Sequence, residues 1–201
     1  MLTRYGFAAI YINDSKYNIR PTFQNIDKIG SPTEIVETLI TFFDCPSINW
    51  QYHRAVEILQ ACCEPNLPPD IFGRFKFTDS GRLKLVNPPH SDFISDVIVL
   101  ASHCLRFGVI GVTDEDAQDG EPLKEFDTYR FIGLACEHLG RSREQAADMT
   151  LTEFLMAWDI KFPEQKKARK ERLSKAEQQR LFEYQDELDK KAAQTRAAKQ
   201  T

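Results

Sequence analysis

Three helix-start signals constrain the fold of this chain more than any other sequence feature. In each, a Ser or Thr stands three residues before a Glu or Gln, so the two side chains can cap the first turn of a helix. The three signals are Ser31-Pro32-Thr33-Glu34, Ser142 with Gln145, and Thr150 with Glu153. Pro32 strengthens the first signal, because proline suits the first helical position. These starts predict a mainly helical body.

Apolar residues three and four positions apart predict the remaining helices. The predicted helical segments are 23–29, 31–43, 50–63, 92–109 and 127–139. Thr22 is the expected cap of the first segment, and the segment 92–109 is expected to be mostly buried. In the segment 31–43, the residues expected to face the core are Ile35, Val36, Leu39, Ile40 and Phe43.

Alternating apolar and polar residues predict two β-hairpins. The first covers residues 7–20 with Asn13-Asp14-Ser15-Lys16 as its turn, and the second covers 75–86 around Asp79-Ser80-Gly81. The expected fold class is therefore α+β, mainly α. It consists of a helical body with two short β-hairpins and an extended C-terminal helix.

The charge distribution divides the chain near residue 160. Residues 161–201 carry 12 Lys/Arg and 7 Asp/Glu, a net charge of +5, whereas residues 1–160 have a net charge of −9. We expect a compact body at 1–160 and a charged helical or partly disordered tail at 161–201. The apolar stripe of the tail is thin and consists of Leu181, Tyr184, Leu188 and Ala192.

The basic cluster of the tail has three interpretations. Lys166, Lys167, Arg169 and Lys170 can form a solvated helix face, bind a protein, or contact phosphates. No aromatic residue interleaves with the cluster and the body is acidic, so nucleic acid is an unlikely partner. The sequence leaves all three interpretations open, with nucleic acid the least favoured.

No sequence pattern predicts catalysis or a cofactor. The chain has no Gly-rich phosphate loop, and its four histidines show no paired metal-ligand spacing. The five cysteines are odd in number and are expected to be reduced, buried thiols of a cytosolic protein. No uninterrupted apolar run approaches the length of about 20 residues that a membrane span needs. We expect no enzyme activity, no cofactor, no metal and no membrane contact.

Two segments resemble the tail assembly chaperones of tailed phages. The first is Ile10 to Phe23, which ends in Arg20-Pro21-Thr22-Phe23 and is followed by the helix at Ser31. The second runs from Gly140-Arg141-Ser142 to Thr150-Leu151-Thr152-Glu153-Phe154. It departs from the family pattern at Arg143, where proline is frequent, and at Ala146-Ala147, where an aromatic residue is usual. Residues 45–125 carry no resemblance.

The resemblance implies a non-enzymatic protein of the host cytoplasm that binds the tape measure protein and recruits tail tube subunits. A homo-oligomer is compatible with this role. A long amphipathic partner needs its apolar stripe covered, and exposed aromatic anchors can provide a groove for a helix. The residues expected to contact partners are Phe154, Leu155, Trp158, Lys166, Lys167, Arg169, Lys170, Leu181, Tyr184 and Leu188.

Three alternatives stand beside this expectation. Phe154, Leu155 and Trp158 can instead pack in the core of the body. The protein can be a structural tail or head-tail adaptor component of the virion, which would remain in finished particles. It can also be a nucleic-acid-binding regulator that uses the basic tail, in which case binding would weaken steeply with salt.

Overall fold

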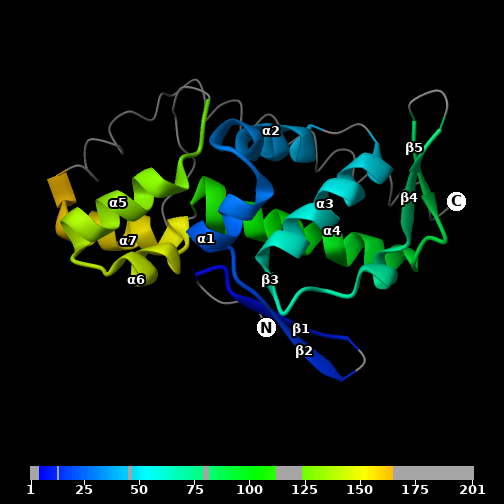
Figure 1. Ribbon diagram of the computed structural model, residues 1–201, viewed down its shortest axis with the longest axis horizontal. Helices are drawn as coiled ribbons and strands as arrows, with labels where there is room; N and C mark the ends of the chain where they lie inside the picture. Colours follow the sequence, from blue (N-terminus) through cyan, green and yellow to red (C-terminus); the bar gives the residue numbers. More distant parts are fainter. Residues whose placement is uncertain (1–4, 13, 45–46, 79–81, 112–123, 165–201) are drawn as a thin grey trace, which may run out of the picture. The chain divides into compact units, whose positions relative to one another are not determined.

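A computed structural model describes residues 5–12, 14–44, 47–78, 82–111 and 124–164 (Figure 1). Its helices and strands all belong to one unit, Met1–Glu115 with Leu123–Lys161. The other unit, Asp116–Pro122 with Phe162–Thr201, lies almost wholly outside the described residues. The predicted C-terminal helix lies outside them too.

The fold class is confirmed, since the structure is mainly helical with two small antiparallel sheets. In chain order the elements are β1 (Ala8–Ile12), β2 (Ser15–Ile19), α1 (Phe23–Ile26), η1 (Asp27–Ile29), α2 (Pro32–Phe43), α3 (Ile48–Cys62), β3 (Cys63–Glu64), η2 (Pro69–Phe72), β4 (Arg74–Phe77), β5 (Leu83–Val86), α4 (Ser91–Leu105), η3 (Arg106–Ile110), α5 (Thr128–Leu139), α6 (Arg143–Ala147) and α7 (Leu151–Lys161).

Both predicted hairpins form, but each belongs to its own sheet. β1 pairs with β2, and β2 also pairs with β3, which was predicted to be the end of a helix. The turn of the first hairpin is tighter than expected. Ile12 pairs with Ser15, so Ser15 and Lys16 belong to β2, and Asp14 adopts a positive φ of 63°. Asp tolerates this left-handed conformation better than most residues.

All three predicted capping boxes are present. Ser31 and Glu34 exchange hydrogen bonds at the start of α2, and Ser142 and Gln145 do so at the start of α6. At α7, the Thr150 amide donates to Glu153 at 2.9 Å and the Glu153 amide donates to the Thr150 hydroxyl at 3.2 Å. Thr22 occupies the N-cap position of α1 as predicted, but its hydroxyl makes no capping hydrogen bond.

The predicted core face of α2 is partly wrong. Ile35 and Val36 are buried and Leu39 is partly buried, but Ile40 and Phe43 are exposed. The buried stripe runs through Ile35, Thr38 and Phe42. The neighbouring stripe holds Val36, Ile40 and Phe43, and only Val36 at its start is buried. A polar Thr inside the buried stripe hid it from the apolar pattern.

Helices α3 and α4 pack together in the centre of the core. Val97, Ala101, Cys104 and Leu105 of α4 are buried. α4 continues into the π-helix η3, and the combined segment Ser91–Ile110 has 20 residues with a mean hydropathy of 1.7. By length and composition alone this segment could cross a membrane, contrary to the expectation from sequence. A core helix of a soluble protein passes the same test.

The segment Ser91–Ile110 is also less buried than predicted. Only 33% of the apolar window is buried, and Val99 is exposed. The apolar spacing correctly predicted a helix here, and Val97, Ala101, Cys104 and Leu105 form its buried face. The exposed side of the segment is mixed, since it carries Asp92, Ser95, Asp96 and Arg106 beside the apolar Val99 and Ile110.

Phe23 provides a test of the core. Its fully buried ring stacks on Phe131 with centroids 5.4 Å apart and meets the edge of Phe154 at 6.1 Å. We expect Phe23→Ala to lower the free energy of unfolding by about 3–5 kcal/mol, because it leaves a cavity between three elements. Urea unfolding measures this loss. The exposed Tyr129 is a control, and Tyr129→Ala should change the free energy by about 0.5 kcal/mol or less.

Candidate partner-binding groove beside the last described helix

Two segments more than 120 residues apart in sequence join at the end of α6. Phe23 donates its backbone N–H to the Met149 carbonyl at 2.9 Å, and Thr22 forms an isolated antiparallel bridge with Thr150. The Arg20 guanidinium contacts the Asp148 carboxylate at 2.5 Å. We call residues 20–23 and 148–150 the clasp. Its two halves come from the two segments that resemble the chaperone family.

Helix packing supports the clasp from behind. Gly108 of η3 is buried and lies so close that an added Cβ would stand 2.9 Å from both the Pro21 carbonyl oxygen and the Ile26 side chain. Thr152 donates its hydroxyl to the Phe107 carbonyl at 3.2 Å. Glycine at 108 therefore permits η3 to contact the first half of the clasp, while Thr152 fixes η3 to α7.

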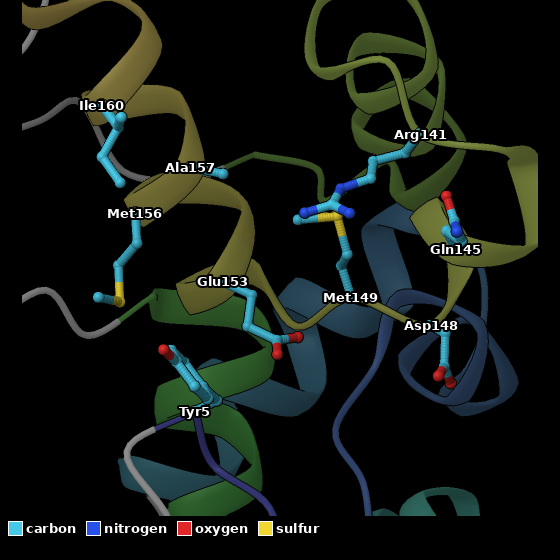
Figure 2. A pocket seen from close by; sticks show the side chains of 9 residues that line it. All are labelled: Tyr5, Arg141, Gln145, Asp148, Met149, Glu153, Met156, Ala157 and Ile160. Atoms are coloured by element: carbon cyan, nitrogen blue, oxygen red, sulfur yellow. The ribbon is translucent and has the colours of Figure 1, made fainter.

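A groove of about 470 Å³ opens beside the second half of the clasp. Figure 2 shows Tyr5, Glu153 and Met156 on one side and Arg141, Gln145 and Asp148 on the other, with Met149 between them. Ala157 and Ile160 extend the lining along α7. Ile160 is 83% exposed, an unusual position for a large apolar side chain. The groove therefore combines an apolar wall with a polar one.

Three of the residues predicted to contact partners, Phe154, Leu155 and Trp158, lie on a different side of α7 from the groove. Phe154 is buried and its ring packs against Phe23 and Phe131, so Phe154 takes the core alternative. Leu155 and Trp158 are partly buried against the core, and the Trp158 ring lies 5.3 Å from that of Phe154. The other predicted residues, Lys166, Lys167, Arg169, Lys170, Leu181, Tyr184 and Leu188, lie outside the described residues.

Apart from Met156, which also belonged to the candidate surface with Phe154, Leu155 and Trp158, the groove-lining residues of α7 were missed, although the sequence carries a signal for them. Glu153, Met156, Ala157 and Ile160 follow the spacing i, i+3, i+4, i+7 and form one helix face. Leu151, Phe154, Leu155 and Trp158 form another apolar face, which attracted the prediction. The core covers only one of the two apolar sides of this short helix, so the other side is left to line the groove.

The electrostatics of the groove centre on Glu153. Burial raises the pKa of Glu153, and the nearby Asp148 carboxylate raises it further, while the Thr150 amide and Arg20 act in the opposite direction. Asp148 is itself held by Arg20 and accepts a hydrogen bond from Gln24 at 3.3 Å. Asp148 of the polar wall is therefore held in place by the clasp, whereas Ile160 of the apolar wall is exposed.

The buried thiols of the described residues are not activated as nucleophiles. Cys62, Cys63 and Cys104 are buried, and burial is the first cause that raises the pKa of Cys63 to about 12. A hydrogen bond with Cys62, together with burial, raises the pKa of Cys104 well above its ordinary value. A protonated thiol is a poor nucleophile. In the described ranges no three His, Cys, Asp or Glu side chains are grouped so as to hold a metal ion.

Comparison with known families identifies one match. A family of unknown function (DUF6246) matches residues 46–177, which is more than half of the chain. The chain belongs to this family. The DUF6246 match includes the groove-lining helices α6 and α7 and the second half of the clasp, but the first half, residues 20–23, precedes it. No curated protein and no solved structure matches the chain.

The raised pKa of Glu153 leads to a testable pH dependence. Glu153→Gln keeps an oxygen to accept the Thr150 amide but carries no charge to desolvate. Because the folded-state pKa is raised, the contribution of Glu153 to stability is fully present below the ordinary pKa of 4.5 and is lost as pH rises through the raised pKa. We expect the variant to melt at a higher temperature than the wild type at neutral pH, with the difference disappearing in acid.

Glu34 is the matched control, because it occupies the same capping position in α2 with the opposite shift. Hydrogen bonds from the Ser31 backbone and then its side chain lower the pKa of Glu34. Its contribution is present above the ordinary value of 4.5 and is lost as pH falls through the lowered pKa. Glu34→Gln should therefore lower the melting temperature at neutral pH. Shifts of the same sign in both variants would contradict the assignment.

Proposed function

We propose that this protein is a non-enzymatic phage tail assembly chaperone that binds the tape measure protein and recruits tail tube subunits. The observation that carries the proposal is the clasp. The two segments that resemble the chaperone family are distant in sequence, yet they join through the Phe23–Met149 hydrogen bond and the Arg20–Asp148 ion pair. If the two resemblances were coincidental, there would be no reason for the two segments to contact each other in the fold.

The groove offers a binding mode for a long amphipathic partner. In this proposal, an apolar side chain of a partner helix enters between Met149, Met156 and Ile160, and the remaining helix lies along α7. Methionine side chains are flexible and adapt to differently shaped apolar groups. Such adaptability suits a protein that covers many different turns of one helical partner in succession.

The proposed residence in the host cytoplasm and absence from the finished particle provide the first test. A tagged chain is recovered from phage-infected cells, and purified particles are analysed by mass spectrometry. The expected outcome is a long tape-measure-like protein among the captured proteins and no copy of this chain in particles. Abundant incorporation into particles would instead identify a structural tail or head-tail adaptor component. Capture of nucleic acid that is lost steeply with salt would favour the regulator.

Ile160 tests the groove itself. Ile160→Glu places a charge on the apolar wall, and we expect recovery of the tape-measure-like protein to fall at least about tenfold, as for a central interface residue. Tyr129→Glu is the matched control, since Tyr129 of α5 is likewise a large, exposed apolar side chain. Both variants should keep the wild-type melting temperature. Equal recovery with the two variants would exclude the groove as the binding surface.

A further inference from the structure

The β4–β5 hairpin is an amphipathic ribbon with two chemically distinct faces. Phe75 and Phe77 pair with Leu85 and Leu83, and these four side chains share the face toward α3. Phe75 lies 5.6 Å from the Tyr52 ring and 4.7 Å from the His53 ring, and Phe77 lies 5.8 Å from the Trp50 ring. Aromatic packing on α3 thus anchors a two-stranded sheet that would be marginal by itself.

The other face of the ribbon is cationic. Strand alternation places Arg74, Lys76 and Lys84 on this face, and Arg82 continues it beyond the start of β5. All four side chains are exposed, and none forms an ion pair with any residue in the part of the chain that the structure describes. Lys76 and Lys84 are direct cross-strand partners. Like charges placed opposite each other destabilise a hairpin, so this pair is not explained by stability.

One edge of the ribbon is open. The Thr78 amide donates to the Arg82 carbonyl, and hydrogen-bonded pairs alternate along an antiparallel ladder. The backbone groups of Phe75 and Phe77 therefore point away from β5, toward an edge at which the structure describes no further strand. The β5 edge differs, because Asn49 donates its side-chain amide to the Leu83 carbonyl at 3.4 Å. Phe77 at the open edge is 65% exposed.

We propose that the open edge of β4 binds an extended segment of another polypeptide whose side chains alternate between acidic and apolar. The segment adds as a third strand, which supplies partners for the backbone groups of Phe75 and Phe77. Its acidic side chains then lie beside Arg74 and Lys76, and its apolar side chains lie beside Phe75 and Phe77. The two faces of the ribbon together select this alternation.

Two other occupants fit the ribbon less well. A second copy of β4 would bring Arg74 and Lys76 against cations of the same kind, and lysine on an edge strand discourages such pairing. Single-stranded nucleic acid needs aromatic rings among the cations for its bases to stack on. Here the aromatic side chains lie on the opposite face of the ribbon, toward α3.

The binding test uses the full chain with Gln at Lys166, Lys167, Arg169 and Lys170, so that the basic cluster after α7 contributes little. The probe is a labelled peptide of about eight residues with alternating Glu and Val, long enough to span β4. A peptide of the same composition with all Glu preceding all Val controls for charge, and an oligothymidylate of the same length controls for nucleic acid. Fluorescence anisotropy at low and physiological salt gives the affinities.

We expect the alternating peptide to bind, and Lys76→Glu with Lys84→Glu to weaken it at least about tenfold. Lys16→Glu with Arg130→Glu makes the same change in net charge at exposed sites elsewhere and should leave binding nearly unchanged. Equal loss in the two double variants, equal binding of the block peptide, tighter binding of the oligothymidylate, or no binding would each overturn the proposal.

A single variant separates binding from folding. Lys76→Glu places a carboxylate opposite Lys84 and converts a repulsive cross-strand pair into an attractive one. We expect the melting temperature to rise while affinity for the alternating peptide falls. A lower melting temperature accompanied by lost binding would indicate a damaged hairpin and would overturn the interpretation of this cationic pair.

Discussion

The backbone contact between Phe23 and Met149 is the constraint on which the rest of the body depends. It joins the end of the first sheet to the turn between α6 and α7, and it seats the Phe23 ring against Phe131 and Phe154. With that ring in place, α5 and α7 gain a shared apolar surface. Arg20 then ties the same junction to Asp148, and its second nitrogen lies 3.9 Å from Glu64 in β3. One junction thus links the first sheet, α1, α6 and α7.

The charged side chains near this junction differ from those of the β4–β5 ribbon in whether they have partners among the described residues. The carboxylates near it are held by Arg20, Gln24 or backbone amides, so they contribute to rigidity. The cations of the β4–β5 ribbon have no such partners among the described residues. The groove and the ribbon are therefore two distinct surfaces, one apolar and one amphipathic. Each is described by its own contacts, and neither proposal requires the other.

The features that were predicted correctly depend on residues close together in the sequence. A capping box involves residues three apart, so Ser31, Ser142 and Thr150 could each be assigned without knowledge of the fold. Alternation likewise located both hairpins. Signals of this kind depend only on neighbouring residues, and they set the helices, the strands and the fold class.

The features that were not predicted depend on contacts between residues far apart in the sequence. β3 has only two residues and no periodicity, so nothing before folding distinguishes it from the end of α3. Ile40 and Phe43 look like core residues until the side of α2 that meets the body is known. The groove was missed for the same reason. Its wall is the second apolar face of α7, and only packing decides which of two faces is covered.

The clasp also has a consequence for how the protein is made. Its first half, residues 20–23, is synthesised well before its second half, residues 148–150, because α2 to α6 lie between them in the chain. Until the second half is made, Phe23 has no Met149 carbonyl to bond with and no Phe154 ring to pack against, although Phe131 has already been made. Closing such a long loop costs chain entropy before the clasp contacts can stabilise the fold. Completion of the body is therefore expected to be a late and comparatively slow event in folding. The Phe23 ring thus gains its last aromatic neighbour only after Phe154 has been made.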